Sequence, residues 1–494
     1  MVTRASLRTN FVYNLIYQVV SLITPLVTAP YVARVLGAEG VGIYSYTQSI
    51  VIYFTLIGGL GSNTHGRREI AASRDNQQMM SNLFYEIMIL RAVTVFVSIV
   101  LFWGFILLNG STYRLYFALQ TIDLISILFD ISWFYQGIEE FKKTATRQIL
   151  VKVAGVCAIL LLVKKESDIP IYILCYSIPV LLGNLFLWPG IKGKLCIPDK
   201  KNVKPFRHFK SEITLFIPYV ATLLYSYVDK TMLGSLADSK AEVGYYAQAF
   251  KFIAIAVAVV SAMADVMTPR IANNYKLGHT DMISDLSHKA TQVIFAMSFF
   301  IFTALFSIGP NLIPWFLGTE YTRSIVLLQI LAFLVIVKGI NNFCGNALLV
   351  ATYHQNLYSK CIWITTLFNI AVNAVLIPRI GAVGACIATV LSEYLLFVMQ
   401  LFYTREYLDI KQMLYAALKY IVASLVVSIV ILFTQRFMKP NPLNTIVLGG
   451  MSGGLYIFIL WMLRDDIVLT IFYKAKDFLR KKGIYSCRST NRRR

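Results

Sequence analysis

Apolar segments of about twenty residues recur along the whole chain and alternate with short polar connections. Each segment is long enough to cross the hydrocarbon core of a bilayer, roughly 30 Å thick, as an α-helix. The pattern predicts an all-α polytopic membrane protein in which no soluble domain is inserted. The fourteen predicted spans are 11–35, 41–62, 82–109, 114–137, 147–163, 170–190, 213–236, 243–269, 290–309, 324–350, 358–378, 383–404, 414–434 and 443–463.

Composition agrees with this prediction. Of the 494 residues, 57% are hydrophobic and 14% are charged, whereas about 25% of the residues in a soluble domain are charged. Seven cysteines form no C-x-x-C pair and have no histidine at metal-binding spacing. We therefore expect neither a disulfide framework nor a zinc site.

The distribution of Lys and Arg predicts the orientation of the chain. The side that holds both termini carries 31 of these residues, the opposite side carries 8, and 7 fall within spans. Because cytoplasmic loops are enriched in Lys and Arg, both termini are expected in the cytoplasm. The net charge of +21 then follows from topology, so we expect no nucleic-acid partner.

An internal repeat appears when the chain is shifted by about 202 residues. Val41-Gly42-Ile43-Tyr44 then falls on Val243-Gly244-Tyr245-Tyr246, and Arg68 falls on Arg270. The alternative is a chance match in an apolar chain of low complexity, but the number of spans per copy agrees with a repeat. An even number of spans gives both copies the same topology, related by an axis along the membrane normal. The predicted parts are an N-lobe (1–190, spans 1–6), a basic cytoplasmic linker (191–212), a pseudo-symmetric C-lobe (213–404, spans 7–12), spans 13 and 14 (405–463) and a basic cytoplasmic tail (464–494).

Ionisable side chains within the spans are the candidate functional residues. A charge in hydrocarbon costs several kcal/mol unless it faces a bundle interior or a wet cavity. We interpret one set as cations that line a substrate cavity and the other as carboxylates that couple transport to a proton or cation. The alternatives are ion pairs that serve packing and, near span ends such as Arg34, snorkelling to the interface. The cations are Arg34, Arg91, Lys152, Lys230, Lys251 and Lys338, and the carboxylates are Asp123, Asp130, Asp229 and Asp265.

Motifs for covalent chemistry are missing from the sequence. It contains no G-x-x-x-x-G-K-[ST] motif for ATP and no D-x-D for a metal-bound sugar nucleotide. No Ser/His/Asp set is placed for nucleophilic catalysis. We therefore expect no catalytic residues, no resident metal and no cofactor apart from H⁺ or Na⁺ as a coupling ion.

Two stretches resemble a known family. NFVYNLIYQVVSLITPLVTAPYVARVLGAEGVGIYSYTQSI followed by GRREIA, and YSYVDKTMLGSLADSKAEVGYYAQAFKF ending in TPRIA, are similar to bacterial O-antigen and capsule repeat-unit flippases of the Wzx type. These belong to the multidrug/oligosaccharidyl-lipid/polysaccharide exporter superfamily, which contains the drug exporters known as MATE transporters. Of the candidate residues, Arg34, the Asp229–Lys230 pair and Lys251 lie within these stretches. Only Arg34 and the Asp229–Lys230 pair match the family's motifs directly.

The resemblance implies a V-shaped, MATE-like bundle that works by alternating access. Its cargo would be an undecaprenyl-diphosphate-linked oligosaccharide, moved from the cytoplasmic to the outer leaflet of the bilayer. A polysaccharide polymerase and a chain-length regulator are the implied protein partners.

Three alternative functions remain open from the sequence. Two belong to the same superfamily, a lipid-linked peptidoglycan-precursor flippase and a cation-coupled drug exporter. The third is a membrane polysaccharide polymerase or glycosyltransferase, which usually needs a large outer loop or an acidic metal-binding motif.

Overall fold

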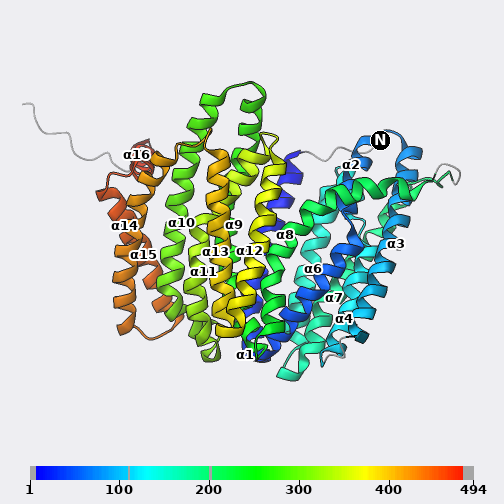
Figure 1. The fold of residues 1–494 in the computed structure, drawn as a ribbon, viewed down its shortest axis with the longest axis horizontal. Helices are drawn as coiled ribbons and strands as arrows, with labels where there is room; N and C mark the ends of the chain where they lie inside the picture. The colour runs from blue at the N-terminus through cyan, green and yellow to red at the C-terminus, as the bar shows by residue number, and fades with distance from the viewer. Residues whose placement is uncertain (1–6, 109–111, 200–202, 482–494) are drawn as a thin grey trace, which may run out of the picture. The chain divides into compact units, whose positions relative to one another are not determined.

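The computed structural model describes residues 7–108, 112–199 and 203–481, which are helical apart from turns and short connections (Figure 1). The longer elements are α1 (Leu7–Gly59), α2 (Ser62–Ser73), α3 (Gln77–Leu108), α4 (Arg114–Leu128), α5 (Ser132–Gly137), α6 (Phe141–Leu162), α7 (Ile169–Phe186), α8 (Phe209–Leu236), α9 (Ala241–Lys276), α10 (Thr280–Phe316), α11 (Arg323–Asn342), α12 (Gln355–Ile380), α13 (Ala382–Thr404), α14 (Ile410–Thr434), α15 (Pro442–Met462) and α16 (Asp466–Lys481). A π-helical segment, Phe343–Val350, continues α11.

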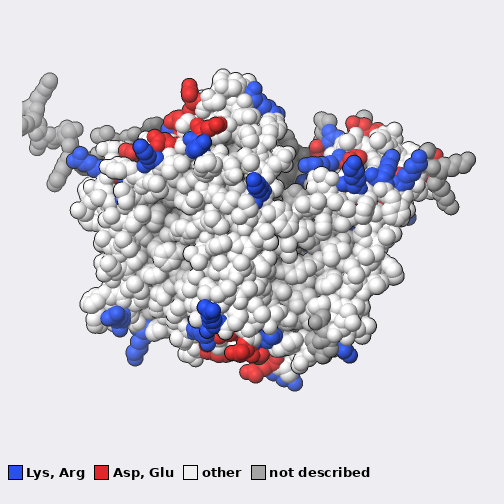
Figure 2. All heavy atoms as spheres, in the orientation of Figure 1, with Lys and Arg blue, Asp and Glu red and all other residues white. Residues whose placement is uncertain are grey.

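Twelve helical segments among the described residues are long and apolar enough to cross a membrane. On the face drawn in Figure 2, charged side chains gather toward the ends of the helices and the band between them is mostly uncharged. The predicted all-α, multi-pass membrane fold is therefore confirmed. The number of fourteen spans stays a prediction.

α1 consists of two helical segments. It runs for 53 residues but is interrupted at Gly37, where φ is 65° and ψ is 179°. A positive φ is readily adopted only by glycine, because glycine has no Cβ. The interruption lies between the first two predicted spans, 11–35 and 41–62.

The contact pattern divides the chain into two compact units. Unit 1 contains Met1–Lys251, Phe316–Leu327 and Ser359–Ser392, and unit 2 contains Phe252–Trp315, Leu328–Tyr358 and Glu393–Arg494. The predicted lobes 1–190 and 213–404, with their linker and C-terminal parts, stay a prediction.

Unit 1 has an aromatic core between α2, α3 and α5. Phe84 stacks on Trp133 with ring centroids 5.5 Å apart, and its edge meets Phe134. Ile70 from α2 is fully buried in the same cluster. Gly137 packs against Ile70, and an added Cβ there would lie 2.6 Å from the Ile70 side chain. This core fixes α2 and α5 against the first turns of α3.

Backbone groups of the basic linker are bonded to one face of α3. Cys196 N–H donates to Ser81 Oγ at 2.8 Å, and Asp199 N–H donates to Asn82 Oδ1 at 3.0 Å. Further along, Lys204 N–H donates to Glu86 Oε1 at 2.6 Å. The described parts of the linker are therefore held to α3 by side-chain–backbone hydrogen bonds.

Glu86 is the main anchor of the linker. Its fully buried carboxylate accepts a hydrogen bond from Arg207 Nη2 at 2.6 Å through Oε2, which also lies 2.8 Å from His208 Nε2. The other ring nitrogen of His208 lies 2.8 Å from His65 Nε2 on α2. Since Lys204 N–H binds the second carboxylate oxygen, the buried charge is surrounded by donors, as a buried carboxylate requires.

Replacing Glu86 by Ala is expected to release the linker from α3. The change leaves Lys204 N–H, Arg207 and His208 without their acceptor, and each hydrogen bond to a charged group is worth about 1.5–3 kcal/mol. Trypsin cleavage at linker lysines and arginines should therefore accelerate by at least about tenfold, because limited proteolysis follows the population of the open form. The exposed carboxylate Asp75 provides the matched control, Asp75→Ala. Equal cleavage rates for Glu86→Ala and wild type would show that Glu86 does not hold the linker.

The two copies of the V-G-x-Y repeat cross each other closely within unit 1. A Cβ added at Gly42 on α1 would lie 1.7 Å from the carbonyl oxygen of Lys240. A Cβ at Gly244 on α9 would lie 2.0 Å from the carbonyl oxygen of Ala38. Gly42 and Gly244, which the sequence repeat aligns with each other, are therefore also the residues at which each copy contacts the backbone of the other copy.

Three glutamates cap helix starts around this crossing. Glu39 accepts from Ala241 N–H at 2.8 Å, and Glu242 accepts from Ala382 N–H at 2.8 Å. Glu320 accepts from Ala38 N–H at 2.8 Å, directly after the interruption at Gly37. The first N–H groups of a helix have no partner inside the helix, and a carboxylate there also meets the positive end of the helix dipole. These carboxylates therefore fix the starts of α9, α13 and the second helical segment of α1 in unit 1.

Candidate functional site: a polar cavity and two buried carboxylate clusters

A cavity of about 960 Å³ lies within unit 1. It is lined by residues of α1, α2, α4, α6, α7 and α8 together with the residues that follow α4. Its charged and amide-bearing lining residues are Gln48, Asn63, Asp123, Asp130, Arg147 and Asn184. Two of the predicted carboxylates, Asp123 and Asp130, therefore face the same cavity.

Arg91 lies beside the cavity and holds part of its wall. The guanidinium is fully buried and donates to Ser62 Oγ and to Asn63 Oδ1, each at 2.6 Å from Nη2. It also donates to the backbone carbonyls of Ile127 and Asp130. Arg91 thereby fixes Asn63 and Asp130, which line the cavity, and contributes its positive charge from behind them.

Arg147 on α6 is a cavity cation that the sequence analysis did not single out. Its Nη1 donates to Asn184 Oδ1 and lies 4.0 Å from Asp130 Oδ1. Only 8% of the residue is exposed, and its buried Nε–H has no hydrogen-bond partner in the described structure. Unlike the guanidinium of Arg91, this one keeps a buried donor that is not satisfied.

A second, smaller pocket of about 220 Å³ lies between α1, α6 and α7. Its walls include Val151, Val156, Ile159 and Cys175, and it shares Arg147 and Val180 with the larger cavity. The predicted cation Lys152 lines this pocket, with Nζ 5.9 Å from the centre of the Tyr17 ring.

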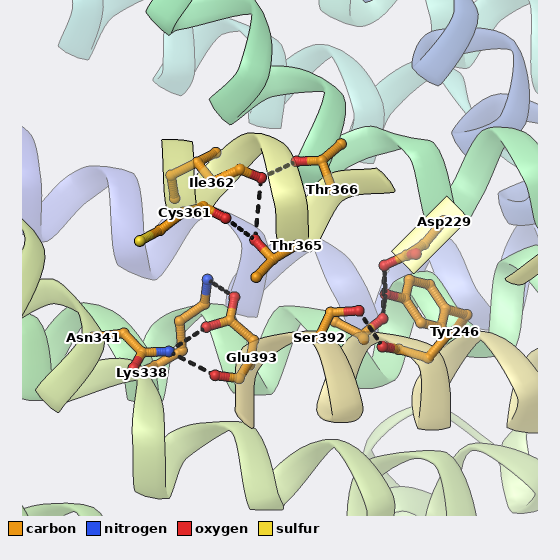
Figure 3. Close-up of polar contacts among 12 residues, drawn as sticks. Asp229, Tyr246, Lys338, Asn341, Cys361, Ile362, Thr365, Thr366, Ser392 and Glu393 are labelled. Atoms are coloured by element: carbon orange, nitrogen blue, oxygen red, sulfur yellow. Dashed lines mark hydrogen bonds and ion pairs between the residues drawn. The ribbon is translucent and has the colours of Figure 1, made fainter. Parts of the chain in front are cut away.

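Asp229 on α8 is buried at the centre of a polar cluster in unit 1 (Figure 3). Its Oδ1 accepts from Asn373 Nδ2 at 2.6 Å, and its Oδ2 accepts from the Tyr246 hydroxyl at 2.9 Å and from Thr389 Oγ1 at 2.7 Å. Asn373 Nδ2 also lies 3.0 Å from Asn369 Oδ1. Asn373 Oδ1 is buried and has no hydrogen-bond partner in the described structure.

The Asp229 cluster has the chemistry of a site for a small hard cation. Carboxylate, amide and hydroxyl oxygens are the ligands that such ions prefer, and Asp229, Asn369, Asn373 and Thr389 supply all three kinds. The unsatisfied Asn373 Oδ1 is an additional oxygen donor. Nowhere in the described chain do three or more His, Cys, Asp or Glu side chains form a group that could hold a metal ion.

A second buried carboxylate, Glu393, lies in unit 2 (Figure 3). It forms an ion pair with the predicted cation Lys338 and accepts from Asn341 Nδ2 at 2.8 Å. Asn341 Nδ2 also contacts the backbone carbonyl of Glu393 at 3.0 Å. α11 changes to the π-helical segment directly after Asn342. In this arrangement, the charge of Lys338 is balanced by a carboxylate that the sequence analysis had not singled out.

The other predicted residues lie in different surroundings. Lys230 Nζ is 5.6 Å from the centre of the Tyr227 ring and 5.9 Å from that of Phe250. Lys251 is half-buried in the same unit and within electrostatic reach of Lys230. Arg34 in unit 1 and Asp265 in unit 2 are exposed. That all ten residues line one shared cavity stays a prediction.

Some of the site residues that were not selected from the sequence could have been recognised in it. Asn369 and Asn373 are four residues apart in an apolar helix and hence on the same face, which would have marked a polar contact. Arg147 was counted among the cytoplasmic Lys and Arg residues that explain the topology. Its charge was thereby accounted for, and nothing else in the sequence pattern marked it as a site residue. Glu393 is a single carboxylate in a span and could have been selected on the same ground as Asp229.

Comparison with known proteins gives a family and a fold. The model of the family described as polysaccharide biosynthesis protein matches residues 7–275. The putative O-antigen transporter of Escherichia coli K12 is 22% identical over 411 residues, which cover 82% of this chain and 98% of that protein. The probable low-salt glycan biosynthesis flippase Agl15 of Haloferax volcanii is 22% identical over 448 residues, covering 89% and 92%.

Solved structures share the fold at low sequence identity. The lipid II flippase MurJ in an inward closed conformation aligns with a TM-score of 0.75 and 15% identity, covering 93% of this chain and 99% of that one. An inward-facing multidrug resistance MATE family transporter aligns with a TM-score of 0.63 and 13% identity, covering 77% and 94%. The MATE-like architecture expected from the sequence is thereby confirmed.

Proposed function

Because the chain belongs to the family of polysaccharide biosynthesis proteins, we propose that it translocates undecaprenyl-diphosphate-linked oligosaccharide repeat units from the cytoplasmic to the outer leaflet, for assembly of O-antigen or capsule. In more general terms, the protein is a flippase of the multidrug/oligosaccharidyl-lipid/polysaccharide exporter superfamily. The relatives are transporters and flippases, not enzymes, and the chain is a multi-pass membrane protein.

The observation that carries the proposal is the polar cavity of unit 1. Its volume of about 960 Å³ is near the upper end of the roughly 300–1,000 Å³ typical of small-molecule sites, which gives room for several sugar residues. Amide side chains such as Asn63 and Asn184 supply hydrogen bonds for sugar hydroxyls. A diphosphate cannot enter hydrocarbon unaided, and the positive charge of Arg147, reinforced by Arg91 behind the wall, offsets its desolvation.

Translocation against a gradient needs an energy source, and the Asp229 cluster is the proposed coupling site. Binding of H⁺ or Na⁺ would neutralise the buried carboxylate and change its bonds to Tyr246, Thr389 and Asn373. These partners come from α9, α13 and α12, and Asp229 itself lies on α8. Ion binding would therefore change contacts among four helices at once. A ligand shifts a conformational equilibrium only through different affinity for the two states, and a carboxylate bound from several helices provides such a difference.

The cellular setting follows from the same proposal. We place the protein in the bacterial cytoplasmic membrane with both termini in the cytoplasm, as the distribution of Lys and Arg predicts. A polysaccharide polymerase and a chain-length regulator on the outer side are the proposed partners that receive the repeat unit. The lipid bilayer supplies the cargo on the inner side.

Reconstituted vesicles test the proposal. Purified protein in proteoliposomes is expected to move fluorescent undecaprenyl-diphosphate-linked oligosaccharide between leaflets, measured by quenching with a reductant that cannot cross the bilayer. Vesicles without protein provide the background rate. Movement of a lipid-linked peptidoglycan precursor or a cationic drug, with no movement of the oligosaccharide lipid, would replace the proposal by one of the two alternatives from the same superfamily.

A further inference from the structure

The two pockets of unit 1 differ in character and meet at one cation. The larger cavity is lined by carboxylate, amide and hydroxyl groups together with aliphatic side chains. The surface of the smaller pocket is mostly apolar, although Thr24, Thr28 and Gln148 also line it. Arg147 and Val180 belong to both. Arg147 therefore lies where the polar cavity meets a mostly apolar groove that runs along α6.

Arg147 retains an unused donor at this junction. The side chain is 91% buried, its Nη1 is bonded to Asn184, and its separation from Asp130 is 4.0 Å, at the outer limit of an ion pair. Its Nε–H is buried without a partner in the described structure. A buried donor without an acceptor is destabilising, and more so when the group is charged. An anionic oxygen at the junction would remove this penalty and complete the guanidinium fork.

The smaller pocket is extended along the helix. Its lining on α6 runs from Arg147 to Ile159, which corresponds to about 18 Å at 1.5 Å per residue. Its volume of about 220 Å³ leaves room for a narrow hydrocarbon segment and not for a sugar chain. Lys152, on the wall of the pocket, adds a second cation near the junction.

We propose that the pocket between α1, α6 and α7 binds the first isoprene units of a polyprenyl diphosphate, and that Arg147 contacts the diphosphate between this lipid and the sugars in the larger cavity. The order of polar cavity, cation and apolar groove matches the order of oligosaccharide, diphosphate and hydrocarbon in one molecule. The inference rests on the proposed function and adds the place of the lipid chain. A phosphate head on a hydrocarbon chain is also the chemistry of a bulk anionic phospholipid, so the experiment must separate the two.

Photo-crosslinking locates the lipid chain on the wild-type protein, without any amino-acid substitution. Full-length protein in nanodiscs is exposed to undecaprenyl diphosphate that carries a diazirine on its first isoprene unit. Crosslinks are expected within 17–28 of α1, 148–159 of α6 and 175–180 of α7, and excess unlabelled undecaprenyl diphosphate should remove them. Crosslinks confined to other helices, or removed equally well by phosphatidylglycerol, would overturn the inference.

Binding measurements on variants test the two halves of the site. Arg147→Gln is expected to weaken binding of undecaprenyl diphosphate by at least tenfold and to leave undecaprenol binding unchanged, and Arg147→Lys should recover part of the loss. Val156→Trp fills the groove and should weaken binding of both lipids. Matched controls on the same helix are Lys142→Gln and Val153→Trp, whose side chains are exposed, and both should bind within twofold of wild type.

The result is separable from the proposed function. If wild-type vesicles translocate the oligosaccharide lipid and Arg147→Gln and Val156→Trp bind undecaprenyl diphosphate normally, the flippase proposal stands and the placement of the lipid is wrong. If wild-type vesicles translocate nothing, the proposed cargo fails irrespective of where the probe binds. Variants are compared only after each elutes as wild type from size-exclusion chromatography.

Discussion

Replacing Asp229 by Asn is expected to abolish gradient-driven translocation while the protein remains folded in the membrane. Asn is nearly the same size as Asp, and its amide can still accept hydrogen bonds from Tyr246 and Thr389, but it lacks the charge that binds H⁺ or Na⁺. Because the neutral side chain cannot bind the coupling ion, coupled transport should fall by up to about 100-fold, the upper part of the range that typical coupling free energies allow. The measurement is the rate of oligosaccharide-lipid movement in vesicles with and without an imposed Na⁺ or proton gradient.

Asp229→Ala separates the structural part of this role from the functional part. Alanine leaves the donors of Asn373, Tyr246 and Thr389 without an acceptor, so a loss of thermal stability should accompany the loss of transport. Asp281→Asn is the matched control, since Asp281 is an exposed carboxylate on α10 that belongs to no predicted site, and it should transport at about the wild-type rate. Full gradient-driven transport by Asp229→Asn would exclude this cluster as the coupling site.

Much of the helical framework could be predicted from the sequence because it depends on local chemistry. Runs of apolar side chains determine which segments can cross a bilayer, and the interruption of α1 at Gly37 lies where the pattern separated the first two spans. The residues of interest within spans could also be selected, since charge in hydrocarbon is costly wherever it occurs.

What the sequence could not predict is which helices place these groups together. Asp229 was identified, but Tyr246, Asn373 and Thr389 lie 17, 144 and 160 residues away, and nothing in a linear pattern pairs them. Lys338 was assigned to a cavity wall, whereas its carboxylate partner Glu393 lies 55 residues further along the chain. Pairing of this kind depends on the packing angles of helices, which apolar periodicity does not encode.

Substituting Ala for Gly42 or Gly244 is expected to destabilise the protein, although Ala favours helices. Both glycines lie within helices, where Gly→Ala alone would stabilise by up to about 1 kcal/mol. Here the new Cβ would lie 1.7 Å from Lys240 O or 2.0 Å from Ala38 O, and backbone atoms cannot move aside by changing a rotamer. The helices must separate, so we expect a net loss of about 2 kcal/mol or more, measured as a lower midpoint of thermal unfolding in detergent.

Gly104 provides the control for this prediction, because it lies in α3 and an added Cβ would meet nothing within 4 Å. Gly104→Ala should therefore match or exceed the wild-type midpoint. Because both clashes arise at one crossing, separation of the helices by the first substitution relieves the second, and Gly42→Ala/Gly244→Ala should lose less stability than the two single changes added together. Strict additivity would mean that the two contacts are independent. In that case a shared helix crossing would not be the reason why both copies of the V-G-x-Y repeat contain glycine.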